Sequence, residues 1–148
     1  MEIVNIYTDA SIKNKKIKAG IYITLPGVTL SSSKEYSENL YNCFSNVVMA
    51  EMIGIDSALQ FCLKEKYIKL FLSKKIIIHN DNTSAINNMS STTEKIGKKH
   101  IEKIKNDLNS IIIFKWIPRT ENKKADKLTK KYYKYYNIST KIILWYYG

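Results

Sequence analysis

Apolar residues recur along this chain at two spacings, and the spacing changes several times. Short runs rich in β-branched and aromatic residues are typical of strands, whereas apolar residues every three or four positions are typical of helices. Strands are predicted over residues 2–8, 18–25, 28–36, 75–79 and 111–117. Helices are predicted over residues 44–66, 81–88 and 94–108, and from a cap at Thr120 to about residue 136. A polar loop over residues 11–16 and a type II turn at Pro26-Gly27 are expected between the first three strands.

The order of these elements, βββαβααβα, predicts the fold class. Strands joined by short turns favour antiparallel pairing, and strands separated by helices favour parallel pairing through crossovers. The sequence therefore predicts an α/β protein with a five-stranded mixed sheet flanked by helices. Because no repeat and no Gly-, Ser- or Pro-rich linker divides the chain, residues 1–148 are expected to form a single domain.

Composition and charge limit the class of protein and the kind of binding partner that fit this sequence. The chain has 148 residues, 45% of them hydrophobic, which excludes a disordered polyelectrolyte, and its net charge is +11. No apolar run approaches the roughly 20 residues of a membrane helix, no signal peptide is evident, and two cysteines suit a reducing compartment. We therefore expect a cytoplasmic protein that does not bind membranes. Its positive charge makes nucleic acid the first partner to consider.

Four acidic side chains stand at positions where carboxylates are informative. Asp9 and Asp81 come just after two predicted strands, at the sheet edge where α/β proteins bind ligands. Glu51 lies in the apolar stripe of the helix over residues 44–66, where an ionised carboxylate costs several kcal/mol unless it is compensated. Either a partner lysine or a metal ion would compensate it. Asp126 shares a face of the last predicted helix with Asn122.

Taken singly, the three aspartates also fit turn, cap or surface roles, and their placement is the reason to group them with Glu51. Four carboxylates in one cleft would repel one another strongly. Two divalent cations would stabilise such a cluster, and hard oxygen ligands select Mg²⁺ or Mn²⁺.

Five groups of motifs, in order along the chain, resemble the type 1 ribonucleases H. They are YTDAS at residues 7–11, AGIY at 19–22, Ala50-Glu51 with Ala58-Leu59, IIIHND at 76–81, and WIPR at 116–119 with NKKAD at 122–126. The resemblance covers about residues 3–136, so that residues 138–148 form an extension. It implies the ribonuclease H-like fold.

The resemblance also implies an activity. The catalytic and metal-binding set falls on Asp9, Glu51, Asp81 and Asp126, with Mg²⁺ or Mn²⁺ as the cofactor and two ions in one site. The implied reaction is cleavage of the RNA strand of an RNA–DNA hybrid, which leaves 5′-phosphate and 3′-hydroxyl ends. No obligate protein partner is evident. The candidate contacts to nucleic acid are Ser11, Asn46, Asn82, Lys98, Lys99, Arg119, Asn122 and Lys123.

The chain departs from many members of this group at three places. The loop over residues 118–124 lacks a histidine, as in a shorter branch; Val48 stands where asparagine is common; and residues 82–115 are too few for a long basic handle. Two other functions remain open: a catalytically silent nucleic-acid-binding module, and another ribonuclease H-fold nuclease that acts on DNA. Ser11 stands where related exonucleases need a second acid, which argues against that activity.

Three further side chains carry expectations about burial. Trp116 is expected to pack in the core, His79 to be a core or capping residue, and His100, among lysines, to be exposed.

Overall fold

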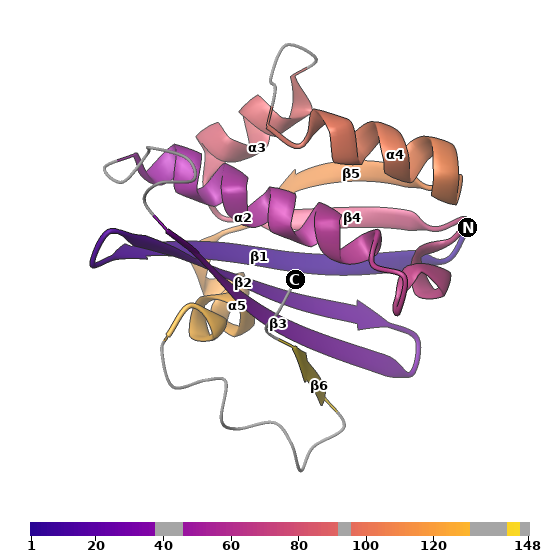
Figure 1. The fold of residues 1–148 in the computed structure, drawn as a ribbon, viewed down its shortest axis with the longest axis horizontal. Helices are drawn as coiled ribbons and strands as arrows, with labels where there is room; N and C mark the ends of the chain where they lie inside the picture. The colour runs from indigo at the N-terminus through magenta and orange to yellow at the C-terminus, as the bar shows by residue number, and fades with distance from the viewer. Residues whose placement is uncertain (38–45, 92–95, 131–141, 146–148) are drawn as a thin grey trace.

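The sheet that organises the molecule has six strands. The computed structural model describes residues 1–37, 46–91, 96–130 and 142–145, and its strands lie in the order β5-β4-β1-β2-β3-β6 (Figure 1). The strands are β1 (Ile3–Lys13), β2 (Lys16–Leu25), β3 (Val28–Ser37), β4 (Lys75–Asn80), β5 (Ile111–Trp116) and β6 (Ile142–Trp145). The first three are antiparallel, β4 and β5 continue in parallel from β1, and β6 lies parallel to β3. The predicted mixed sheet is confirmed, and β6 adds a strand that was not predicted.

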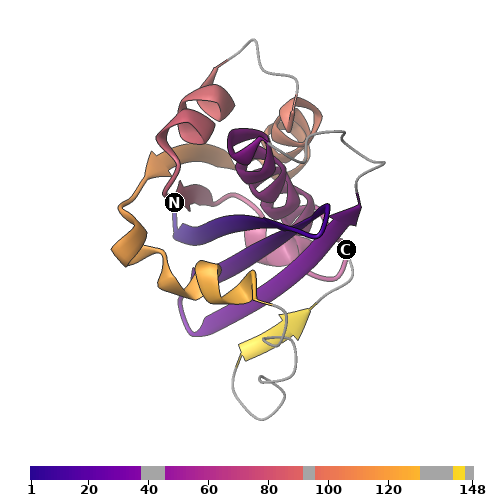
Figure 2. The ribbon, with the colours of Figure 1, turned by 90° about the vertical axis from the view of Figure 1, so that its left-hand side faces the viewer.

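Helices cover both faces of this sheet. The α2 (Val47–Cys62), α3 (Thr83–Ser90) and α4 (Lys98–Leu108) helices lie on one face, and α5 (Lys123–Leu128) lies on the other (Figure 2). Short 3₁₀ helices span Ile68–Phe71 and Arg119–Glu121. Within the described ranges, no helix has the length and apolarity needed to cross a membrane.

The main core lies between the sheet and α2. Ile6 and Ile78 from the central strands pack with Ile55 and Leu59, and all four are fully buried. Each such side chain stabilises the fold by about 1.5–3 kcal/mol. The α2 helix is buried on nearly all sides rather than along one stripe, although Val47 in its first turn is exposed.

The connection between β1 and β2 differs from the predicted polar loop. The two strands pair as far as Lys13 and Lys16, so that only Asn14 and Lys15 form the turn. Both turn residues have positive φ, 52° and 57°, as in the type I′ turns that match the twist of a hairpin. The strand pattern therefore continues through Ser11, and this residue lies in β1.

The predicted long last helix is wrong in the described residues. Thr120 lies inside a 3₁₀ helix, and α5 ends at Leu128. Side chains of the sheet donate hydrogen bonds to the backbone carbonyls at the end of α5. The Ser33 hydroxyl donates to the Leu128 carbonyl at 2.7 Å, and the Ser11 hydroxyl donates to the Thr129 carbonyl at 3.4 Å. The remainder of the predicted helix, residues 131–136, lies outside the described residues.

Two of the three expectations about burial are wrong. Trp116 is half exposed because it is the last residue of the edge strand β5. His100 is partly buried, with its Nδ1 atom 2.6 Å from Asp56 Oδ1. His79 is buried as expected, and its ring stacks on Tyr7 with the ring centroids 4.4 Å apart.

Close backbone approach between β2 and α5 requires a glycine. A Cβ atom at Gly20 would collide with the Ala125 carbonyl oxygen and lie 2.8 Å from Leu128 Cβ. At Gly54, where α2 crosses β1, a Cβ atom would lie 3.4 Å from Ala10 Cβ, which is ordinary contact.

These distances predict opposite outcomes for the same substitution. Gly20→Ala should lower the free energy of unfolding by about 1–3 kcal/mol through overpacking. Gly54→Ala is the matched control, and its effect should stay within about 1 kcal/mol because alanine favours the helix. Urea unfolding of both variants measures the difference, and equal destabilisation by the two would contradict this account of α5 packing.

Candidate active site

Asp9 and Asp81 lie together because β4 ends before β1 does. The parallel pairing of these strands stops at Tyr7 and His79, and β1 continues through Asp9 to Lys13. Asp9 therefore lies within its strand rather than after it, which corrects the sequence-based expectation. Asp81 follows the last residue of β4, so both aspartates occupy the edge that β4 leaves open.

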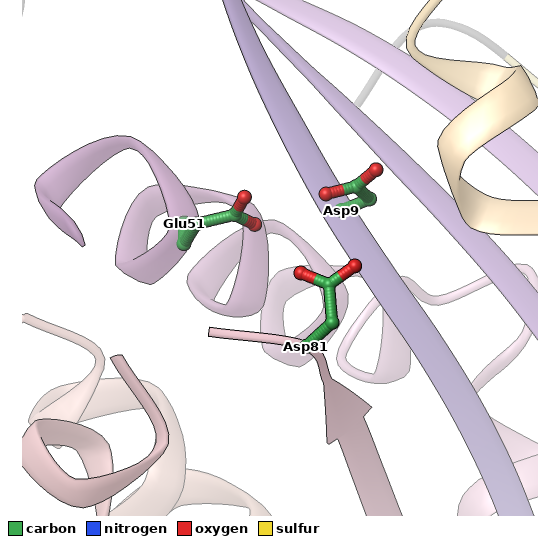
Figure 3. A group of neighbouring side chains, drawn as sticks. All are labelled: Asp9, Glu51 and Asp81. Atoms are coloured by element: carbon green, nitrogen blue, oxygen red, sulfur yellow. The ribbon is translucent and has the colours of Figure 1, made fainter. Parts of the chain in front are cut away.

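Glu51 reaches the same edge from α2. The Asn46 side chain caps this helix by accepting a hydrogen bond from the Met49 amide at 3.1 Å. Glu51 is 5% exposed, in keeping with its predicted place on the apolar face. The carboxylates of Asp9, Glu51 and Asp81 point toward one another (Figure 3), and one oxygen from each lies within 4.8 Å of the others.

The buried Asn80 side chain links Glu51 to β1. Its amide nitrogen donates to Glu51 Oε1 at 3.0 Å and to the Thr8 carbonyl and hydroxyl oxygens at 3.1 and 3.0 Å. Its oxygen accepts from the Asn82 amide at 2.8 Å. Asn80 is fully buried, so these bonds fix Glu51 relative to the two strands.

Two more donors position Asp81. The Asn122 amide donates to the Thr8 carbonyl at 2.8 Å and approaches Asp81 Oδ2 at 3.4 Å. The Trp116 indole donates to the Asp81 carbonyl at 3.1 Å. Asn122 is 1% exposed and acts here as a positioning residue, and its contact with nucleic acid stays a prediction.

Sequence reasoning missed the roles of Asn80, Thr8 and Trp116 in this network. Asn80 directly precedes Asp81 at the end of an apolar strand, and a polar residue in that place is the signal that could have identified it.

Burial and mutual repulsion make the acids hard to ionise together. Burial, followed by the charges of Glu51 and Asp81, raises the pKa of Asp9 to about 9. Burial raises the pKa of Glu51 to about 7, although the hydrogen bond from Asn80 opposes that shift. A nearby positive charge would have lowered these pKa values, so their rise indicates that the site lacks positive charge.

Among residues 1–37, 46–91, 96–130 and 142–145, no lysine or arginine supplies that charge. None of the ion pairs among the described residues involves Asp9, Glu51 or Asp81, so the partner-lysine explanation for Glu51 does not apply there. Three convergent carboxylates that lack a cationic partner are the donor set that a hard divalent cation prefers. The residues therefore fit a divalent metal site.

Asp126 lies beside this group rather than within it. Its side chain is within hydrogen-bonding reach of Asp9, but the cluster of oxygens within 4.8 Å does not include it. About half of the side chain is exposed, and Lys130 Nζ lies 3.7 Å from its Oδ1 atom.

The other predicted contacts to nucleic acid lie at the surface or cap helices. Arg119, Lys123, Lys98 and Lys99 are exposed. Asn46 is exposed at the start of α2, and the Asn82 side chain caps α3 by accepting from the Ala85 amide at 2.9 Å. Ser11 is partly buried, and its hydroxyl donates to Thr129.

Comparison with known proteins agrees with this architecture. The model of the reverse transcriptase-like family matches residues 8–132. This chain belongs to that family. No curated protein matches its sequence.

Solved structures that this reverse transcriptase-like chain resembles include ribonucleases H1 and a ribonuclease H domain. LC11 ribonuclease H1, isolated from compost by a metagenomic approach, is 24% identical and has a TM-score of 0.57 over 86% of this chain and 93% of that chain. The same enzyme in complex with an RNA/DNA hybrid is 23% identical and has a TM-score of 0.59 over 84% of this chain and 92% of that chain. The N-terminal ribonuclease H domain of a Mycobacterium tuberculosis protein is 17% identical and has a TM-score of 0.55 over 86% of this chain and 91% of that chain. The ribonuclease H fold is thus confirmed, and membership of the shorter branch stays a prediction.

The raised pKa values predict how stability depends on pH without metal. Asp9 loses its proton near pH 4 when unfolded and near pH 9 when folded, so between these values the folded state holds a proton that the unfolded state has released. Metal-free protein should therefore lose stability as the pH rises from about 5 to about 8. Asp9→Asn should flatten this decline, and thermal unfolding measured in a chelator tests both statements.

Asp107→Asn, at an exposed position on α4, serves as the control and should follow the unchanged protein. Mg²⁺ should restore stability at about pH 8 and much less at about pH 5, because protons compete for the carboxylates. A melting temperature that rises steadily from pH 5 to pH 8 in the chelator would contradict the repulsion inferred here.

Proposed function

We propose that this protein is a metal-dependent endoribonuclease that cleaves the RNA strand of RNA–DNA hybrids, leaving 5′-phosphate and 3′-hydroxyl ends. The observation that carries the proposal is the convergence of the Asp9, Glu51 and Asp81 carboxylates at one edge of a ribonuclease H fold. Family membership supports the reaction class, and the hybrid-bound ribonuclease H1 of the same fold supports the substrate.

The metal would be held by Asp9, Glu51 and Asp81, with Asp126 as the fourth acid of the proposed catalytic set. Two Mg²⁺ or Mn²⁺ ions, when bound, would activate the attacking water and stabilise the leaving 3′ oxygen. Asn80 orients Glu51, and Asn122 with Trp116 orients Asp81, so that the carboxylates are preorganised before substrate arrives.

Substrate binding would use side chains around the acids. Arg119 and Lys123 are exposed next to Asn122, and Lys98 and Lys99 form the first turn of α4, where they can contact phosphates. Ser11, Asn46 and Asn82 adjoin the acid-bearing segments in sequence, and we assign to them the contacts with ribose 2′-hydroxyls that distinguish RNA from DNA.

One cleavage assay separates this proposal from its alternatives. With Mg²⁺ or Mn²⁺ the protein should cut the RNA strand of a labelled hybrid and leave double-stranded RNA, double-stranded DNA and branched DNA intact. Asp9→Asn should lower the rate at least about 100-fold with little loss of hybrid binding, since the change removes a metal ligand and not a phosphate contact.

Asp107→Asn makes the same chemical change at an exposed site and should retain full activity. Tight hybrid binding without cleavage would favour the silent binding module. Cleavage confined to DNA would favour another nuclease of this fold. Either result would overturn the proposal.

The Asn80 network gives an independent prediction. Asn80→Ala removes a buried donor from Glu51 and from Thr8, and it should lower the free energy of unfolding by about 1–3 kcal/mol. It should also raise the metal concentration needed for half-maximal activity, while KM for the hybrid changes little, because Asn80 acts through Glu51. Asn87→Ala, at an exposed position on α3, is the control. Unchanged metal dependence in a folded Asn80→Ala variant would refute this positioning role.

A further inference from the structure

The edge strand β5 presents backbone hydrogen-bonding groups away from the sheet. Among the described strands it pairs only with β4. The Ile111 amide donates to Lys74 and the Ile117 amide to Asn80, so the odd-numbered residues direct their backbone groups toward β4. Because backbone groups alternate in direction along a strand, those of Ile112, Phe114 and Trp116 point to the outer edge.

A groove runs along this same edge. It has a volume of about 530 Å³ and lies between β5 and the α3–α4 pair. Its lining includes Ile112, Ile113 and Phe114, three successive residues whose side chains alternate between the two faces of the sheet. Ile112 and Phe114 share a face of the sheet, so a hollow lined by all three residues runs lengthwise along β5, the strand that carries the outward backbone groups.

The chemistry of the groove fits a peptide better than a nucleic acid. Six of the eleven lining residues are apolar, and they occur on the helices, as Met89 and Ile101 do, as well as on β5. A phosphate backbone gains little from such walls, whereas an added strand buries apolar side chains and pairs its own backbone with the free edge.

Charge selects between possible peptides. Lys98 and Lys105 line the groove against one acid, Glu102, and Lys115 is exposed on β5 itself. A second copy of this chain, with a net charge of +11, would bring like charges together at this edge. An acidic segment would be attracted to it.

We propose that the β5 edge binds an extended segment of a partner protein in which apolar and acidic residues alternate, added to the sheet as a further strand. The apolar side chains of the segment fill the groove beneath α3 and α4, and its acidic side chains lie near the lysines of the rim. This site is separate from the carboxylate cluster and does not depend on the proposed nuclease activity, although it shares Lys98 with the proposed contacts to the hybrid.

The probe that tests it is a short fluorescein-labelled peptide that alternates isoleucine with aspartate. Fluorescence anisotropy should show saturable binding to the full chain, and the same peptide with lysine in place of aspartate should not bind. Lys105→Glu should weaken binding about tenfold, a change of about 1.4 kcal/mol. Lys103→Glu alters the same helix by the same charge but lies outside the groove lining, and it should change binding less than about twofold.

Amide hydrogen exchange tests strand addition directly. The amides of Ile112, Phe114 and Trp116 should exchange at least about tenfold more slowly when the peptide is bound, and those of Ile111 and Ile113 should not change. Three results would each overturn the proposal: no binding, equal weakening by both lysine variants, or binding without this alternating protection. Displacement of the peptide by a single-stranded oligonucleotide that itself protects these amides would assign the groove to nucleic acid instead.

Discussion

Repulsion among buried carboxylates is the constraint on which the rest of this structure depends. Asp9, Glu51 and Asp81 would separate if their backbones were free to move, because burial and neighbouring negative charge disfavour the ionised forms of Asp9 and Glu51. They are held in place by elements that are themselves packed into the core, and by the amide of Asn80 that bridges an acid to the sheet. The fold thus holds together carboxylates that repel one another, and a bound divalent cation would relieve this repulsion and stabilise the folded state.

The sheet topology determines where the three carboxylates come together. Parallel pairing of β1 with β4 ends two residues before Asp9, and the chain leaves β4 immediately before Asp81. The β1 strand continues beyond the end of β4, and this difference in length leaves an open edge that Glu51 faces from α2. The α2 helix crosses β1 beside Asp9, where Gly54 faces Ala10 across an ordinary van der Waals distance. The site is therefore a consequence of strand lengths and helix packing more than of any single loop.

The sequence was informative where the periodicity is strong and where a polar residue breaks an apolar pattern. Glu51 could be found because it interrupts the buried side of a helix, and the order of strands and helices was enough to predict the mixed sheet. The end of α5 could not be predicted, because Ser33 and Ser11, distant in sequence, take its last carbonyls. Trp116 was misjudged for a similar reason: only the strand order shows that β5 lies at an edge.

The contrast between a basic surface and an acidic centre has a physical consequence. A chain with a net charge of +11 attracts a polyanion over long distances, yet the carboxylates at Asp9, Glu51 and Asp81 repel the phosphates that come closest to them. Exposed cations such as Arg119 and Lys123 add to that long-range attraction, but among the described residues they form no ion pair with these carboxylates. Only cations inside the cluster reverse the sign of the field where a phosphate must approach. If the protein has the proposed function, hybrid binding at the surface and reaction at the centre would be governed by separate charges, and removal of the metal would affect the reaction far more than binding.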